Sequence, residues 1–259
     1  NKILKFFEEH TLSTLPHTLL IEGAKGSGRH TVCQYLADLY QLSIEDISEN
    51  LNYDYLENIS LRVTPWVYII DSAKLSVKNE NAILKFLEEP MKNSFIVLLC
   101  ENKHNLLDTI RNRCHLLTME KYSKEQLTLF LPPWEDAAAI LEICETPGEI
   151  VAFQNVSVSD LIALCNKIFD KIDSASFANT LTLSNNLAFK DEKDKYNVTV
   201  FLRALLKVAY DRVIKNLQFS ISDYMITSDY FNRFYVKNVD KKYLFENYLI
   251  TLKKSRCGT

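Results

Sequence analysis

Short apolar runs alternate with amphipathic segments along the first 120 residues of the chain. The runs are continuously hydrophobic, which is typical of strands buried on both faces of a parallel sheet. They cover His17–Glu22, Trp66–Asp71 and Phe95–Cys100, with a weaker strand signal at Ser43–Ile47. Segments with apolar residues every three or four positions predict helices at 2–10, Arg29–Tyr40, Tyr53–Val63 and Lys78–Glu89. This alternation predicts a doubly wound α/β domain whose ligand site lies at the carboxyl ends of the strands.

The first apolar run leads into a glycine-rich turn that is followed by a helix. Gly23, Gly26 and Gly28 lie in this turn, and the chain holds only five glycines in all. Glycines let several backbone N–H groups converge on one anion, and the dipole of the following helix favours negative charge there. The spacing is that of a phosphate-binding P-loop, in which Lys and then Ser or Thr follow the last glycine. The turn is therefore a candidate nucleotide site.

The two positions that carry P-loop chemistry are altered in this chain. Arg29 stands in the lysine position and keeps the positive charge, but its planar guanidinium cannot act as a compact point charge inside a loop shaped for ammonium. His30 offers no hydroxyl to magnesium, and Thr31 lies one position too late. We expect the turn to hold a nucleotide loosely at most and to hydrolyse it poorly. A glycine-rich turn that binds no ligand explains these residues equally well.

Polar residues follow two of the predicted central strands. Asp71 ends the strand at Trp66–Asp71, where P-loop ATPases place an Asp that supports magnesium and often a Glu that polarises the attacking water. Ser72 occupies the Glu position, so the general base is missing. Asn102 follows the strand at Phe95–Cys100, where a polar residue can face a bound phosphate. A core strand that ends in Asp by chance is the alternative interpretation of Asp71.

Composition limits the classes of protein to which the chain can belong. With 259 residues, 47% of them hydrophobic, it is long enough for two or more domains with real cores. Its formal net charge of −3 gives no general basic surface for nucleic acid. Its six cysteines are scattered singly, which predicts reduced thiols and no metal site. The longest apolar run, Phe95–Cys100, is too short to span a bilayer, so we expect a cytoplasmic protein without membrane contact.

Four blocks of the sequence stand out: HTLLIEGAKGSG, VYIIDSAKLS, NAILKFLEEP and FIVLLCENKHNLLDTIRNRC. Together they resemble the AAA+ family of clamp-loader subunits of bacterial DNA polymerase III, and within it the delta-prime branch. The third block is similar to the family's helix ending in Leu-Glu-Glu-Pro, and the end of the fourth resembles its Ser-Arg-Cys motif, with Asn112 in the Ser position. The resemblance implies that Arg113 is an arginine finger acting on ATP bound by a neighbouring subunit, and that Asn102 is a sensor. A surface residue in a salt bridge is the alternative interpretation of Arg113.

The departures from the family pattern point in one direction. The resemblance implies a second sensor Arg near the turn at Thr146–Gly148, yet Glu149 stands there. Together with the altered loop and Ser72, this change predicts a subunit that has lost its own hydrolysis. We therefore expect no firmly bound cofactor in this chain, with ATP and magnesium held at a neighbouring subunit's site. The family's small zinc module is expected to be absent, because the segment 41–52 is short and carries no cysteine cluster.

Helical patterns dominate the sequence after Met119. Helices are expected at Tyr122–Leu131 with Ser123 as a cap, and at Glu135–Cys144, Pro147–Phe153, Val158–Ile172, Ala175–Ala188, Asn197–Leu217, Ser222–Tyr235 and Lys241–Lys253. The predicted fold is an α/β P-loop (AAA+) domain with a parallel sheet at 1–120, a small helical lid domain at 121–156 and an all-α collar domain at 157–259. The resemblance assigns the collar to oligomerisation. Aromatic residues between Tyr224 and Tyr248 suggest stacking on nucleic acid, but their spacing is more typical of a core.

These observations predict an accessory, non-hydrolysing clamp-loader subunit that donates Arg113 to a neighbouring ATP site during DNA replication. The expected partners are the other clamp-loader subunits, the sliding clamp and primer-template DNA. Two alternatives remain. One is an active AAA+ ATPase in which Arg29 replaces the lysine and Thr31 supplies the hydroxyl, and the other is a P-loop-like scaffold outside replication.

Overall fold

A computed structural model describes most of the chain, which divides into two compact units. The described residues are 2–88, 94–131, 137–153, 157–174, 176, 179, 198–215, 217, 219–234 and 240–257. The first unit spans Asn1–Tyr122 and the second spans Ser123–Thr259. The finer division of the second unit into a lid and a collar stays a prediction. The expected helix at 175–188, except for residues 176 and 179, lies outside the described residues.

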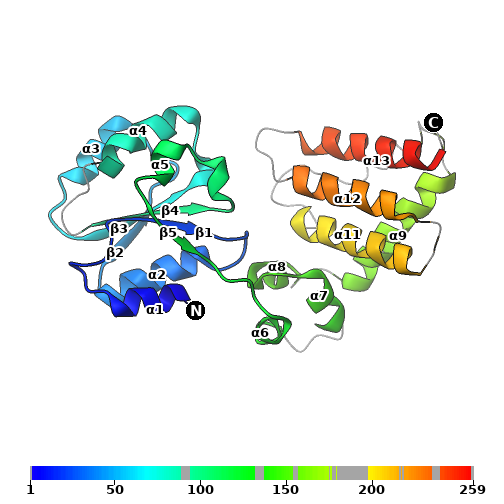
Figure 1. The fold of residues 1–259 in the computed structure, drawn as a ribbon, viewed down its shortest axis with the longest axis horizontal. Coiled ribbons are helices and arrows are strands. Elements are labelled where there is room, and N and C mark those ends of the chain that lie inside the picture. The colour runs from blue at the N-terminus through cyan, green and yellow to red at the C-terminus, as the bar shows by residue number, and fades with distance from the viewer. Residues whose placement is uncertain are drawn as a thin grey trace. The chain divides into compact units, whose positions relative to one another are not determined.

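The first unit is built on a five-stranded parallel sheet (Figure 1). Its strands are β1 (Thr18–Glu22), β2 (Ser43–Asp46), β3 (Trp66–Asp71), β4 (Phe95–Cys100) and β5 (His115–Thr118). They lie in the order β2-β3-β4-β1-β5, and every neighbouring pair is parallel. The three central strands are almost continuously buried, because helices cover both of their faces. The predicted parallel α/β domain is thereby confirmed.

Helices form a layer on each face of this sheet (Figure 1). One layer holds α1 (Lys2–Glu9) and α2 (Arg29–Tyr40), and the other holds α3 (Tyr53–Ser60), α4 (Val77–Glu88) and α5 (Asp108–Arg111). Two short 3-10 helices, η1 (Ser72–Lys74) and η2 (Lys103–Asn105), follow β3 and β4. The loop after β1 therefore opens at the carboxyl edge of the sheet, where doubly wound proteins bind their ligands.

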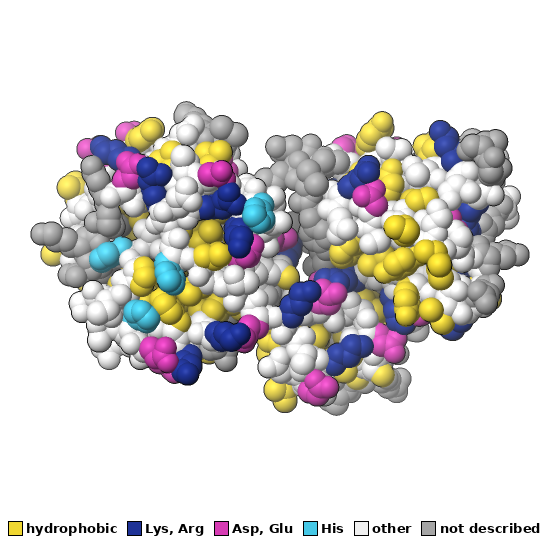
Figure 2. All heavy atoms as spheres, viewed as in Figure 1, with side chains coloured by type: hydrophobic (Ala, Val, Ile, Leu, Met, Phe, Trp, Pro, Cys, Tyr) yellow, Lys and Arg dark blue, Asp and Glu magenta, His cyan; other side chains and the backbone are white. Residues whose placement is uncertain are grey.

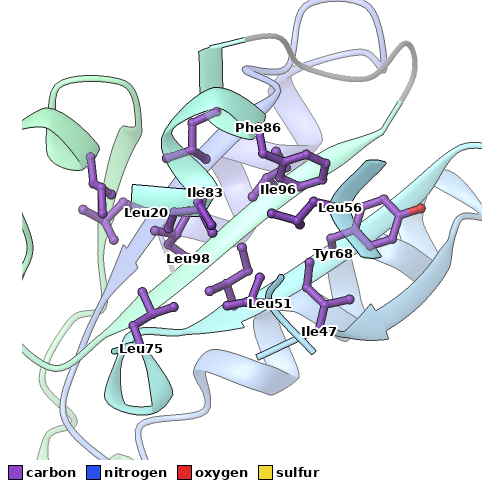
Figure 3. Close-up of a cluster of buried hydrophobic side chains, with 14 of the residues drawn as sticks. Leu20, Ile47, Leu51, Leu56, Tyr68, Leu75, Ile83, Phe86, Ile96 and Leu98 are labelled. Carbon is purple, nitrogen blue, oxygen red and sulfur yellow. The ribbon is translucent and has the colours of Figure 1, made fainter. Parts of the chain in front are cut away.

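Two hydrophobic cores hold the strands in place. Successive side chains of a strand point to opposite faces, so Tyr68, Ile96 and Leu98 enter the core beneath α3 and α4, as Figure 3 shows, whereas Val67 and Val97 enter the core beneath α1 and α2. All five side chains are at most 1% exposed. Burial of each large apolar side chain contributes about 1.5–3 kcal/mol, so the positions of the strand ends are strongly determined.

Two features of the first unit differ from the predicted pattern. Strand β5 was not predicted, since of its four residues only Leu117 is buried and no apolar run marks it. Helix α3 ends at Ser60 rather than Val63, whose side chain is 91% exposed. Arg62 explains the early end, because its guanidinium turns back to Glu45, 2.6 Å away, and stacks over the Trp66 ring.

The second unit is helical throughout its described residues. Its elements are α6 (Lys124–Thr128), α7 (Ala137–Ile143), α8 (Pro147–Ala152), α9 (Val158–Ser174), α11 (Val198–Ile214), α12 (Ile221–Arg233) and α13 (Lys241–Cys257). Helices α11 and α13 each contact both α9 and α12, which makes a four-helix arrangement (Figure 1). The predicted cap is confirmed, because the Ser123 hydroxyl accepts from the N–H of Gln126.

The aromatic residues of α12 and α13 form the core of this unit. Four of these side chains are less than 7% exposed: Tyr230, Phe234, Phe245 and Tyr248. Their interpretation as part of a core is therefore confirmed. Tyr243 on α13 is an exception, because its side chain is largely exposed. Figure 2 shows Lys, Arg, Asp and Glu side chains interspersed on the visible face of each unit, without a single basic patch. Within the described residues, no helix is long and apolar enough to cross a membrane.

Candidate functional site

The glycine loop begins with a residue for which only glycine fits. The N–H of Gly23 donates to the carbonyl of Cys100 in β4, 3.0 Å away, and the carbonyl of Glu22 accepts from the N–H of Met119, 2.7 Å away, just after β5. A Cβ at Gly23 would lie 2.6 Å from Cγ and 2.8 Å from Cβ of Met119. The start of the loop is therefore tied to both strands that flank β1.

The rest of the loop leads directly into helix α2. Gly26 and Gly28 have φ angles of 79° and 92°, in the left-handed region that favours glycine. Gly28 caps α2 without a side-chain hydrogen bond, so no capping side chain competes with an anion for the first N–H groups of this helix. Ser27 Oγ is buried without a hydrogen-bond partner among the described residues. The backbone of the loop thus fits an anion such as phosphate.

The side chains of the loop do not fit a magnesium–nucleotide complex. Arg29 is 8% exposed, and its Nη1 is buried without a hydrogen-bond partner within the described part of the chain. His30 and Thr31 are exposed on the first turn of α2, and neither places a hydroxyl directly after the lysine position. The backbone cradle is therefore retained, whereas the groups that hold the outer phosphates and the metal in a P-loop are replaced.

The charge of Arg29 is directed into the protein. Burial raises the pKa of the Cys33 thiol to about 12, and the nearby Arg29 guanidinium partly opposes this rise. Burial also raises the pKa of the Cys100 thiol to about 11, with a further rise from Glu22 and an opposing effect of Arg29. The Arg29 guanidinium therefore lies close enough to affect both thiols electrostatically. Cys100 is at the carboxyl end of β4, and Cys33 is on the face of α2 that meets the sheet.

Asp71 and Asn102 reach the carboxyl edge of the sheet, but each caps a short helix there. Asp71 Oδ1 accepts from the N–H of Ala73, 2.9 Å away, at the start of η1. Asn102 Oδ1 accepts from the N–H of His104, 2.9 Å away, at the start of η2. Ser72, in the position of the missing base, is 7% exposed. The structure thus brings these residues to the edge that holds the glycine loop, with the carboxylate and the amide engaged in local hydrogen bonds.

Tyr122 contacts the glycine loop, which no sequence pattern predicted. Its hydroxyl donates to the carbonyl of Ser27, 2.9 Å away, across 95 positions of sequence. A Cβ at Gly28 would lie 3.7 Å from the same hydroxyl. The sequence pattern assigns Tyr122 to a helix, but α6 begins at Lys124, so the tyrosine is left to cover the loop.

Arg113 lies at the opposite edge of the sheet from the loop. It follows α5 and precedes β5, whose first residue, His115, pairs with Leu19 near the start of β1, whereas Gly23 follows the last residue of β1. Arg113 Nη2 forms an ion pair with Glu88 at the end of α4, and Nη1 donates to the carbonyl of Thr109, 2.7 Å away. The salt bridge of the alternative interpretation is therefore present, and the finger role stays a prediction.

Glu149, which stands near the position of the second sensor, is buried and serves the structure of the second unit. Its Oε2 accepts from the N–H groups of Glu145 and Thr146, at 2.7 and 3.3 Å, which completes a capping box at the start of α8. Its Oε1 accepts from Nε of Arg203 on α11, at 3.2 Å. A carboxylate held in this way joins α8 to α11.

Comparisons with known proteins bear on these observations. Residues 40–123 match a family model described as "DNA polymerase III, delta subunit". The chain is 26% identical to DNA polymerase III subunit delta' of Escherichia coli (strain K12) over an alignment of 185 positions, which covers 64% of this chain and 55% of that protein. The resemblance to the clamp-loader family is therefore confirmed. A segment of 55 residues is 44% identical to the same subunit of Bacillus subtilis (strain 168), covering 21% of this chain and 17% of that protein.

Solved structures with a similar fold bear on the fold of this chain. A DNA polymerase III gamma subunit-related protein from Thermotoga maritima superposes with a TM-score of 0.50 at 15% identity, covering 98% of each chain. A variant of Thermotoga maritima RuvB superposes with a TM-score of 0.56 at 16% identity, covering 85% of this chain and 94% of that chain. Both are AAA+ proteins, so the AAA+ fold is supported, while identities this low say nothing of activity.

The extent of the matches determines what they support. The chain spans about half the length of the first of these curated relatives and less of the second. The family model covers Asp71, Asn102 and Arg113 but not the glycine loop. The comparisons thus support a resemblance to the clamp-loader family over part of the relatives' length.

Proposed function

We propose that this chain is an accessory clamp-loader subunit that does not hydrolyse ATP itself and donates Arg113 to ATP bound by a neighbouring subunit. ATP and magnesium belong to the neighbour's site, and no cofactor is firmly held here. The partners are the other clamp-loader subunits, the sliding clamp and primer-template DNA. The role is to complete and activate an assembly.

The separation of Arg113 from the chain's own loop carries this proposal. Strands β1 and β5 run parallel with His115 beside Leu19, and Gly23 lies four positions further along the chain than Leu19. At about 3.3 Å per residue these positions span roughly 13 Å, and Arg113 lies two residues further away. An arginine at that edge cannot reach a phosphate in its own loop, whereas it can meet one presented by another subunit.

The condition of the chain's own site supports the same conclusion. Arg29 is buried, Ser72 replaces the general base, and Asp71 and Asn102 cap short helices. An arginine finger stabilises the charge that builds on the transferred phosphoryl group and is worth about 10³-fold or more in rate. A subunit without hydrolysis of its own can therefore still control the rate at a neighbouring site.

The interspersed charges of the visible surface fit a protein that meets DNA as part of a larger complex (Figure 2). A strongly basic stripe is the usual mark of a subunit that binds DNA alone. The proposal therefore assigns DNA contact to the assembled ring. The chain is proposed to act in the cytoplasm.

Two measurements test the proposal. The isolated chain should show no magnesium-dependent ATP turnover. Arg113→Ala should lower single-turnover ATP hydrolysis by the complex reconstituted with its own partner subunits, while leaving assembly intact, because Arg113 makes only half-exposed contacts. Arg111→Ala, which removes a second arginine from the same turn, is the matched control and should have a much smaller effect.

Each alternative has a distinct result. Turnover by the isolated chain that is abolished by Arg29→Ala would establish an active ATPase with a variant loop. Failure to recover any clamp-loader or polymerase subunit with the tagged chain would favour a scaffold outside replication. Unchanged hydrolysis in the Arg113→Ala complex would remove the finger assignment.

A further inference from the structure

The guanidinium of Arg113 is held by residues from two different elements. Nη1 donates to the carbonyl of Thr109, 2.7 Å away, within its own turn. Nη2 donates to Oε1 of Glu88, the last residue of α4. Each terminal nitrogen therefore has one partner. A guanidinium has five N–H donors in one plane, so three remain for another partner.

The backbone beneath this side chain is well determined. The N–H of Arg113 donates to the carbonyl of Ile110 at 3.1 Å, and the Cys114 thiol donates to the same carbonyl at 3.2 Å. The Ile110 side chain is fully buried in the core beneath α4. The turn therefore determines the position of the Arg113 backbone, and the contacts with Glu88 and Thr109 determine the conformation of its side chain.

We infer that Glu88 is a positioning residue for Arg113, which it orients so that the remaining N–H groups face the phosphate of the neighbouring subunit's ATP. This inference rests on the proposed role of Arg113 as a finger. Thr109 contributes only a backbone carbonyl, so Glu88 is the one side chain of the described residues that is recorded in contact with the guanidinium.

The exposure of the pair indicates what kind of effect Glu88 has. The side chains of Arg113 and Glu88 are 35% and 50% exposed, and an ion pair in such surroundings adds little to folding stability. Its effect is instead on rotamer freedom, since an arginine held in advance loses less entropy when it meets the phosphate. Glu88 should therefore change the rate of hydrolysis and leave the unfolding of the chain almost unchanged.

A negative charge near a triphosphate can also act in the opposite sense. If Glu88 competed with the phosphate for Arg113, removing its charge would raise the rate. The two bonds to Nη1 and Nη2 leave Nε and one hydrogen on each terminal nitrogen available, so Arg113 can keep Glu88 while it binds phosphate. The inference is therefore that loss of the carboxylate lowers the rate.

The test uses the reconstituted complex with Glu88→Gln, Glu88→Ala, Arg113→Ala and the double variant Glu88→Ala/Arg113→Ala. Glu88→Gln should lower the single-turnover rate at saturating ATP by about two- to fivefold, with the KM for ATP unchanged. Glu88→Ala should have at least as large an effect, and neither change should matter once Arg113 is alanine. Asp108→Asn, which removes the carboxylate that pairs with Arg111 on the same turn, is the matched control and should leave the rate unchanged.

The outcomes separate this inference from the function on which it rests. If Arg113→Ala slows hydrolysis but Glu88→Gln leaves it unchanged or raises it, the positioning role is wrong and the finger stands. If Glu88→Ala slows hydrolysis equally in the presence and absence of Arg113, Glu88 acts by another route and the inference also fails. If Arg113→Ala has no effect, the finger and its positioning residue fall together. Thermal unfolding of the isolated Glu88→Gln chain checks that its fold is retained.

Discussion

Replacing Glu149 by alanine tests whether the residue near the second sensor position has become a structural one. The carboxylate is 7% exposed and accepts from two backbone N–H groups and from the Arg203 guanidinium. Glu149→Ala removes the acceptor of all three donors and leaves Arg203 only partly compensated. We expect the second unit to lose stability and the first unit to be unaffected.

The size of the loss follows from these contacts. A buried donor left without its partner costs about 1–3 kcal/mol, with the larger values for charged groups. Arg203 keeps an ion pair with the exposed carboxylate of Glu145, at 2.7 Å, and lies over the Phe231 ring at 5.2 Å, so part of its interaction survives. We therefore expect a total loss of roughly 2–4 kcal/mol.

Urea unfolding of the whole chain, followed by circular dichroism and by hydrogen exchange of α8 and α11, measures this loss. With an m value of about 2–3 kcal/mol/M, the midpoint of the second unit should fall by about 1 M. Glu145→Gln is the matched control, because it disrupts the contact of an exposed carboxylate with the same arginine. It should cost less than about 1 kcal/mol. Equal shifts for the two variants, or no shift for Glu149→Ala, would show that burial of Glu149 does not have the assigned effect.

Two further predictions concern the first unit. Gly23→Ala should destabilise it by about 1–3 kcal/mol in urea unfolding, because the new methyl group meets Cβ and Cγ of Met119. Equal stability of the variant and the parent would contradict the close approach. Burial raises the pKa of the Cys33 thiol to about 12, so this thiol should not react with a thiol reagent at pH 8 until urea unfolds the chain. Labelling of Cys33 in the folded chain, identified by mass spectrometry, would show that the thiol is accessible.

Local sequence patterns were sufficient to predict the central strands of the first unit. Strands β3 and β4 are continuous apolar runs, and β1 precedes a turn in which three glycines satisfy steric and conformational needs. Strand β5 escaped prediction because it lies at the edge of the sheet and buries one side chain. Its position depends on pairing with β1, nearly 100 residues earlier, which no local periodicity records.

The candidate site could be predicted in its residues but not in their contacts. The family motifs single out Asp71, Asn102 and Arg113. The strand order explains why Asp71 and Asn102 lie at the same edge of the sheet as the glycine loop, and why Arg113 lies at the opposite edge. The hydrogen bond from Tyr122 and the ion pair from Glu88 join positions 95 and 25 residues apart. Such contacts follow from tertiary packing, so no spacing rule could have found them.

If the chain lacks hydrolysis as proposed, changing one residue would not supply it, because two of the positions concerned also hold the fold together. Glu149 holds Arg203, so an arginine at 149 would place two cations together in a buried site and leave the capped N–H groups of α8 without an acceptor. Asp71 caps η1, and turning it toward a metal would break that cap. Glu149 and Asp71 each have a structural partner, so giving either position another role would cost stability. Under the proposed function the loop matters for its shape, because its first residues tie β1 to β4 and to Met119 after β5, and Arg113 lies just before β5.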